Sequence, residues 1–237
     1  MKAERIPLGG KRARFIAFLG CDGSGKSAVI QGIKSHLEAA GYRVYLGHWM
    51  PRAVAVSYTR TENVENPHGK KPRGIVLSVL KLFWIWLNWR VTWARFATTT
   101  PRYHFVLFDR YHGDLIVDPK RYRYGGFLFL ARLASLLMPQ PDQIILLDAP
   151  VDVLLKRKRE MSASELSQLR EAYFAYCQRN SCSKIVDASQ PVEKVIQAAL
   201  QSLMQKSKGE QKRGLAFHGD GSNNSNFRSA DKKSLHN

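Results

Sequence analysis

Eight residues near the N-terminus have the types and the spacing of a phosphate-binding loop. The segment from Gly20 to Ser27 reads Gly-Cys-Asp-Gly-Ser-Gly-Lys-Ser and fits the pattern G-x-x-x-x-G-K-[ST]. Glycines let successive backbone N–H groups point at phosphate oxygens, and a following helix N-terminus adds partial positive charge. Lys26 would neutralise the β- and γ-phosphates, and the Ser27 hydroxyl would ligate Mg²⁺. The motif residues expected to bind nucleotide are Gly20, Cys21, Gly23, Ser24, Gly25, Lys26 and Ser27.

A carboxylate and a guanidinium follow an apolar run, at Asp109 and Arg110. The run 105–108 has the composition of a buried strand, and ligands bind beyond the carboxyl ends of strands in open parallel sheets. Asp109 would hold Mg²⁺ through water or orient Arg110, and Arg110 would clamp an acceptor or donor phosphate through two hydrogen bonds. A structural Asp–Arg pair is the alternative interpretation.

Two further basic segments have both a structural and a functional interpretation. Residues 156–159 are four consecutive cations, which form either a solvated face or a lid that closes over the nucleotide. Residues 121–126 alternate Arg with Tyr before two glycines, which indicates either a surface loop or an acceptor-binding loop. In an acceptor-binding loop, arginine binds an anionic oxygen and tyrosine stacks on a ring. The residues concerned are Arg121, Tyr122, Arg123 and Tyr124.

Short apolar runs alternate with helical patterns along the middle of the chain. This alternation predicts an α/β fold with a mostly parallel sheet and right-handed crossovers. The predicted strands cover 15–19, 43–46, 105–108, 144–147 and 184–186. The predicted helices cover 28–40, 127–137, 151–160, 165–180 and 192–204.

The segment 75–96 combines a long apolar stretch with four tryptophans within ten positions. Lys81, Asn88, Arg90 and Arg95 interrupt it, which makes it a poor membrane-spanning helix. A long core helix is the structural interpretation, and an interfacial helix with tryptophans at headgroup depth is the functional one. Burial in a dimer interface stays open as well.

The composition limits the classes of protein that remain. The chain has 237 residues, of which 44% are hydrophobic, so it can build a buried core and wholesale disorder is excluded. Lys and Arg number 37 against 19 Asp and Glu, and the net charge of +18 indicates an anionic partner. That partner is phosphate, nucleic acid or an acidic membrane. No nucleic-acid-binding module is recognisable, so we expect no specific nucleic acid partner.

Composition also divides the chain into three parts. Residues 1–14 are a loose basic leader, 15–205 carry the alternating strands and helices, and 206–237 predict a disordered tail rich in Gly, Ser, Asn and Lys. The three cysteines have no metal-ligand spacing and leave one thiol over in any pairing, which favours a reducing cytoplasm. Peripheral contact with an anionic membrane is the alternative.

Four segments together resemble the thymidylate kinase family of P-loop nucleoside monophosphate kinases. They are 18–27 (Phe-Leu-Gly-Cys-Asp-Gly-Ser-Gly-Lys-Ser), 108–111 (Phe-Asp-Arg-Tyr), 146–150 (Leu-Leu-Asp-Ala-Pro) and 186–191 (Val-Asp-Ala-Ser-Gln-Pro). The resemblance implies that 15–205 form a P-loop NTPase domain, a three-layer α/β sandwich with a five-stranded parallel sheet flanked by helices. It also implies ATP with Mg²⁺ as the phosphoryl donor.

The resemblance assigns roles by motif position. Asp22 matches an acidic residue near the acceptor sugar, and Lys26 matches the phosphate-binding lysine. Arg110 matches an arginine that touches the acceptor phosphate, and Arg157 or Arg159 falls where lid arginines lie. These five are the expected catalytic residues.

Three more positions take roles from the same resemblance. Ala188 and Gln190 belong to the segment that lies near the adenine in relatives, so they join the expected nucleotide-binding residues. Arg90 matches a further arginine that binds the acceptor phosphate.

The acceptor half of the sequence departs from the family's motifs. Thymidylate kinases carry Arg-Glu-Pro-Gly-Gly-Thr after the second strand, where 47–52 read Gly-His-Trp-Met-Pro-Arg. They follow the Asp-Arg motif with Ser and then Tyr-Gln-Gly, where this chain has 118–119 (Asp-Pro) and the loop 121–126. We therefore expect a divergent branch of the family, with His48 and Arg52 among the acceptor-binding residues.

The sequence thus predicts an Mg-ATP-dependent phosphotransferase with Ser27 and Asp109 at the metal. Its acceptor stays open, and a sugar or glycan would suit the many Trp, Tyr and Arg residues. One alternative is a true nucleoside monophosphate kinase with an altered base pocket. Another is a basic, membrane-associated protein that binds ATP.

Overall fold

The computed structural model describes residues 13–49, 71–99 and 103–204, with the side chains of 95–99 excepted. Arg52, residues 1–12 of the predicted leader and the whole predicted tail lie outside the described residues. The first strand already begins at Arg14, the last residue of that leader.

A five-stranded parallel sheet forms the centre of the fold, in the order β2-β3-β1-β4-β5. The strands are β1 (Arg14–Leu19), β2 (Val44–His48), β3 (Phe105–Asp109), β4 (Gln143–Asp148) and β5 (Ser183–Asp187). β1 and β3 are buried along their whole length, which explains why they read as continuous apolar runs. The predicted α/β architecture with five parallel strands is confirmed.

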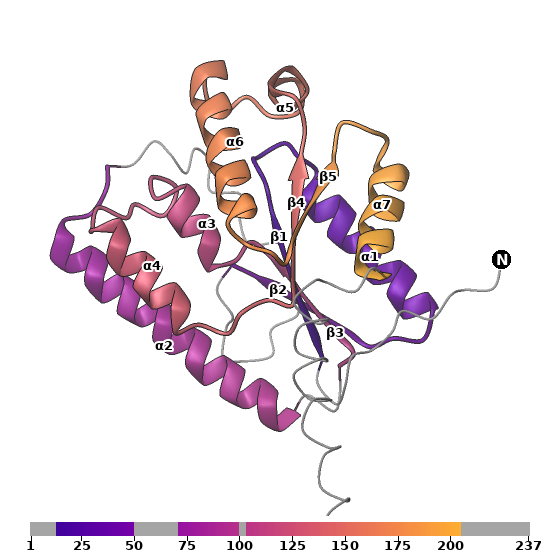
Figure 1. Ribbon diagram of the computed structural model, residues 1–237, viewed down its shortest axis with the longest axis horizontal. Coiled ribbons are helices and arrows are strands. Elements are labelled where there is room, and N and C mark those ends of the chain that lie inside the picture. The colour runs from indigo at the N-terminus through magenta and orange to yellow at the C-terminus, as the bar shows by residue number, and fades with distance from the viewer. Residues whose placement is uncertain (1–12, 50–70, 100–102, 205–237) are drawn as a thin grey trace, which may run out of the picture.

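Helices cover both faces of the sheet and make it a three-layer sandwich (Figure 1). α1 (Lys26–Ala39) and α7 (Val192–Met204) pack against each other on one face. The other face carries α2 (Ile75–Thr99), α3 (His112–Val117), α4 (Leu128–Leu136) and α6 (Ala163–Gln178). α5 (Val151–Arg157) lies beyond the carboxyl end of β4.

The parallel register brings the carboxyl ends of the strands to one edge of the sheet. His48 at the end of β2 pairs with Asp109 at the end of β3, which also pairs with Phe18 of β1. Asp148 at the end of β4 pairs with Asp187 at the end of β5. The motifs predicted to carry chemistry therefore share the edge at which parallel sheets bind ligands.

The long helix α2 is a core helix on one side and an exposed apolar surface on the other. Leu82, Ile85 and Trp89 are buried, and the Trp89 ring lies 4.9 Å from that of Phe108 in β3. By length and composition, α2 could also cross a membrane, and 28% of its most apolar window is buried. The core interpretation therefore holds for one side. The interfacial and dimer interpretations concern the exposed side, which carries Ile75, Val76, Leu77, Val79, Leu80, Phe83, Trp84, Leu87 and Val91.

Candidate active site

The phosphate-binding loop joins β1 to α1 and turns on glycines. Gly20 and Gly23 have φ of 144° and 85°, in the region that residues with a Cβ rarely adopt. A Cβ on Gly20 would lie 2.5 Å from the carbonyl oxygen of Leu147, so the loop packs too closely on β4 for a side chain. α1 begins at Lys26, directly after the loop, and its N-terminal N–H groups are therefore available to an anion.

Lys26 is buried and points its ammonium into the loop. Its Nζ donates to the carbonyl oxygens of Gly20 and Cys21, both at 2.8 Å, and to Ser24 Oγ at 3.3 Å. Burial, together with the nearby charge of Arg110, lowers the pKa of Lys26 to about 8. A bound phosphate would favour the charged lysine, so the loop and this side chain suit an anionic ligand.

The two residues predicted to hold a metal are in contact. Ser27 Oγ donates to Asp109 Oδ2 at 3.3 Å, although the two residues are 82 positions apart. The other carboxylate oxygen of Asp109 is buried and has no hydrogen-bond partner among the described residues. No cluster of three His, Cys, Asp or Glu that could hold a metal occurs within 13–49, 71–99 and 103–204. The pair fits Mg²⁺, which takes one or two carboxylates and completes its shell with substrate phosphates and water.

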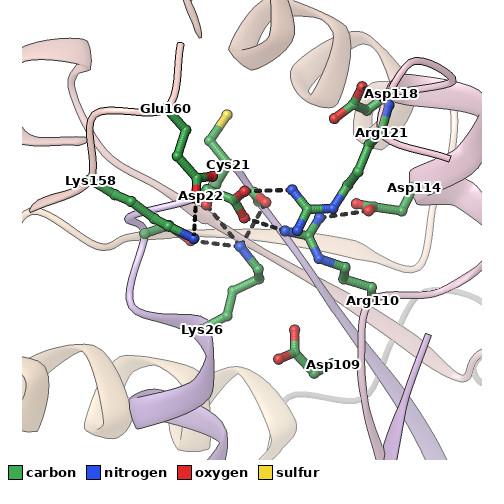
Figure 2. Close-up of polar contacts among 12 residues, drawn as sticks. Cys21, Asp22, Lys26, Asp109, Arg110, Asp114, Asp118, Arg121, Lys158 and Glu160 are labelled. Atoms are coloured by element: carbon green, nitrogen blue, oxygen red, sulfur yellow. Dashed lines mark hydrogen bonds and ion pairs between the residues drawn. The ribbon is translucent and has the colours of Figure 1, made fainter. Parts of the chain in front are cut away.

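Asp22 lies between two arginines (Figure 2). Arg110 and Arg121 each form an ion pair with one of its carboxylate oxygens. Burial acts to raise the pKa of Asp22, but the charges of Arg110, Lys26 and Arg121 outweigh it and hold this pKa well below its usual value. The Asp22 carboxylate is therefore ionised at neutral pH. The phosphate-binding loop, the end of β3 and the predicted acceptor loop meet at this side chain.

Arg110 is buried in an unusual backbone conformation just after β3. Its φ of 71° lies in the left-handed region, which costs about 1–3 kcal/mol for a residue other than glycine. Its backbone N–H donates to Phe18 in β1 at 3.0 Å, which holds this turn in place. The guanidinium bridges two carboxylates, with Nη1 at 2.6 Å from Asp114 and Nη2 paired with Asp22.

Asp114 in α3 is a site residue that the sequence analysis missed. Besides Arg110, its carboxylate accepts hydrogen bonds from the hydroxyls of Tyr122 and Tyr173. The spacing of four between Arg110 and Asp114 gives no helical signal, because Arg110 has φ of 71° and precedes α3. α3 itself is too short for a helical period, and Tyr173 lies 59 positions further on.

The acceptor loop is anchored to β2 and α2 through Tyr122. Its ring stacks on Trp49, with centroids 4.4 Å apart and an interplanar angle of 18°. Lys81 Nζ lies 5.8 Å from the Trp49 centroid and donates to the carbonyl oxygen of Tyr122 at 2.5 Å. Burial, with repulsion from Arg73 and Arg123, lowers the pKa of Lys81 to about 8. Trp49 and Lys81 were not predicted as site residues, because a lone Trp and a helical Lys carry no motif.

Arg123 and Tyr124, both predicted to bind the acceptor, hold the loop together instead of pointing at Asp22. Arg123 Nε donates to the backbone carbonyl of Lys71 at 3.1 Å, and φ of Arg123 is 52°. The buried Tyr124 donates its hydroxyl to the carbonyl of Phe127 at 3.0 Å. A role of either residue toward the acceptor stays a prediction.

The other residues predicted to bind the acceptor have no direct contact with Asp22 within the part of the chain that the structure describes. His48 is exposed at the end of β2, beside Asp109 in the sheet register. Arg90 is exposed on α2, nine residues beyond Lys81, which corresponds to a rise of about 14 Å along the helix. Arg52 lies outside the described residues.

The predicted lid and adenine segments meet beside the loop. Arg157 Nη1 donates to the carbonyl oxygen of Ala188 at 2.9 Å and lies 3.5 Å from that of Gly23. Arg159 and Gln190 are exposed nearby in sequence, after α5 and β5 respectively. The structure therefore brings Arg157 to the loop, and the roles of Arg159 and Gln190 stay predictions.

A known protein resembles this chain over most of its length. No protein-family model matches the chain. The chain is 26% identical over 197 residues to "Probable thymidylate kinase 1" of Saccharolobus solfataricus, an alignment that covers 79% of this chain and 95% of that protein. The similarity supports a relationship to thymidylate kinase-like proteins, which the five-stranded parallel sheet also fits.

Proposed function

We propose that the protein is an ATP-dependent kinase of the nucleotide kinase type, which transfers the γ-phosphoryl group to a negatively charged acceptor. The convergence on Asp22 carries this proposal, since Arg110 and Arg121 pair with it beside the loop that holds Lys26. Phosphoryl transfer needs cations around the oxygens on which charge is spread, and little covalent chemistry from the protein. The thymidylate kinase similarity supports the same class of reaction.

The donor would bind at the loop, with its phosphates against the N–H groups at the start of α1. Lys26 would exchange its carbonyl contacts for β- and γ-phosphate oxygens. Ser27 and Asp109 would hold Mg²⁺, which would neutralise phosphate charge during the transfer. Arg157, already in contact with the loop, and the exposed Arg159 would close over the nucleotide as lid residues.

The acceptor would bind between Asp22 and the two arginines. The low pKa of Asp22 makes its carboxylate a weak base, so it would orient the acceptor by accepting a hydrogen bond from a sugar hydroxyl, while an oxygen of the acceptor phosphate attacks the γ-phosphoryl group and ADP leaves. Arg110 and Arg121 would bind an anionic group of the acceptor, which favours a phosphate-bearing molecule such as a nucleoside monophosphate. The stacked Trp49 and Tyr122 would form a wall for its ring.

An ADP-release assay over a panel of acceptors tests the function. The panel holds nucleoside monophosphates, sugar phosphates and uncharged sugars, and we expect turnover with at least one nucleoside monophosphate. Lys26→Ala should lower that rate at least about 100-fold, because a transition-state cation is lost. Turnover with uncharged sugars but with no nucleoside monophosphate would contradict the negatively charged acceptor and favour a sugar or glycan acceptor instead. Absence of ADP release with every acceptor, together with no heat of Mg-ATP binding in calorimetry, would refute it.

The exposed side of α2 favours a second role for a cytoplasmic protein, peripheral binding to anionic membranes. α2 contacts α4, which also carries exposed large apolar side chains, and neither helix contains an acidic residue. Such a surface gains from both burial of apolar area and attraction to anionic lipid. Liposomes containing phosphatidylserine should carry the protein upward in flotation at low salt and less at high salt. A stable dimer in light scattering that ignores these liposomes would show instead that a second copy covers the surface.

A further inference from the structure

The carboxylate of Asp114 is the most enclosed charge in the site. Its side chain has no exposed area, and it lies on α3, four positions after Arg110. A buried carboxylate is costly unless all its lone pairs find donors. Here Oδ2 accepts from Arg110 at 2.6 Å and from Tyr122 at 2.5 Å, and Oδ1 accepts from Tyr173.

These partners come from three separate parts of the fold. Arg110 follows β3, Tyr122 belongs to the acceptor loop, and Tyr173 lies on α6. Burial and the neighbouring Asp114 raise the pKa of both tyrosines well above the usual value, so both hydroxyls keep their protons and donate at neutral pH. Asp114 therefore connects the end of β3, the acceptor loop and α6 through hydrogen bonds to a single carboxylate.

The two Nη atoms of Arg110 bind different carboxylates, and this arrangement sets the direction of the guanidinium. Nη1 is occupied by Asp114, which leaves Nη2 directed at Asp22 in the candidate site (Figure 2). Tyr122 donates to the same Asp114 carboxylate. The residue directly before it in the loop, Arg121, forms an ion pair with the other oxygen of Asp22. One buried carboxylate thus fixes the orientation of both arginines, one directly and one through its loop.

We infer that Asp114 is a positioning residue that, through Arg110 and Tyr122, holds both arginines in the orientation that binds the acceptor. This inference rests on the proposed function. It makes a specific claim, because Asp114 touches neither the loop that binds the donor nor the metal pair. Removing its charge should therefore weaken acceptor use and spare donor binding.

The test is steady-state kinetics of Asp114→Asn with the nucleoside monophosphate that gives the fastest ADP release in the panel assay. Asparagine keeps the shape but offers an amide donor to partners that already donate. We expect kcat/KM for the acceptor to fall at least about 100-fold, mostly through KM, with the Kd for Mg-ATP within about twofold of wild type. Tyr173→Phe, which removes one donor to Asp114 and the 3.5 Å contact with Arg110 Nη1 but keeps the ion pair between Asp114 and Arg110, should cost about 3- to 10-fold. Glu193→Gln, an exposed change at the start of α7, is the matched control.

A double-mutant cycle separates positioning from a general structural role. In an Arg110→Ala background, Asp114→Asn should lower kcat/KM less than in wild type, because the arginine that it contacts directly is gone and only the effect through Tyr122 remains. Equal effects in both backgrounds, or an equal loss of Mg-ATP affinity, would overturn the inference. If Asp114→Asn does not fold, Tyr173→Phe carries the same cycle. An active wild type with unaffected variants refutes the positioning role alone, whereas a wild type inactive on every acceptor refutes the proposed function and this inference with it.

Discussion

Arg170 of α6 binds Asp148 at the end of β4 through two parallel hydrogen bonds, 2.6 Å from Nε and 2.7 Å from Nη2. The bond fixes α6, which carries Tyr173, to the edge of the sheet where the candidate site lies. It forms between a strand end and a helix 22 positions later, so neither residue finds the other through local spacing.

Arg170→Ala should lower the free energy of unfolding by about 1–2 kcal/mol. The Asp148 side chain is only 13% exposed and would lose two charge-assisted bonds, while the 32% exposure of Arg170 limits the effect. Urea denaturation measures the change. Arg132→Ala, an exposed arginine on α4, should change stability by less than about 0.5 kcal/mol, and equal effects of the two variants would show that the bond adds nothing.

Asp109→Asn should raise the Mg²⁺ concentration needed for half-maximal activity at least about tenfold. The carboxylate that contacts Ser27 would lose its charge, and an amide is a poorer ligand for a hard cation. The measurement is a magnesium titration at saturating ATP. Asp152→Asn, at an exposed aspartate on α5, should leave the titration unchanged. An unshifted midpoint in Asp109→Asn would remove Asp109 from the metal site.

ATP affinity should be constant below pH 8 and fall above it. Lys26 has a pKa of about 8 in the free protein, and bound phosphate favours its charged form, so binding above pH 8 must first take up a proton. Isothermal calorimetry should show a loss of up to about tenfold per pH unit in this range. Lys26→Met should bind more weakly and without this slope. The same slope in both proteins would assign the effect to another group.

Two tryptophans on α2 should differ sharply in their contribution to stability. Trp89 is 1% exposed and packs on Phe15 and Phe108, whereas Trp84 is 57% exposed. Trp89→Ala should therefore cost about 3–5 kcal/mol, and Trp84→Ala less than about 0.5 kcal/mol. Guanidinium denaturation compares the two. A large cost for Trp84→Ala would mean that its side chain is covered in solution.

The fold was predictable because its decisive signals are local. The run 105–108 is continuously apolar because β3 is buried along its length, and such a run predicts a buried strand. The glycines of the phosphate-binding loop predict a turn because they readily adopt positive φ. α3 was not predicted, because six residues with a glycine in the first turn give no helical period.

Residues of the candidate site could be predicted only where they belong to a recognisable sequence motif. Lys26 and Arg110 belong to motifs, and the structure places Lys26 in the loop and Arg110 in contact with Asp22 of that loop. Asp114 and Tyr173 have no motif, since their roles arise from the tertiary contacts that enclose Arg110. The exposed side of α2 shows the same limit, because apolar residues look alike in sequence whether they face a core or solvent.

The buried and exposed sides of α2 also differ in how strongly folding restricts the residue types they can carry. Ile85 is buried in the interior, whereas Val76 and Leu80 are 73% and 59% exposed. Folding alone would accept lysine, glutamate or glutamine there, because these are good helix formers. Persistent leucines and valines at such positions would record selection by something other than folding. A saturation library selected for function in cells would map that pressure residue by residue along one helix.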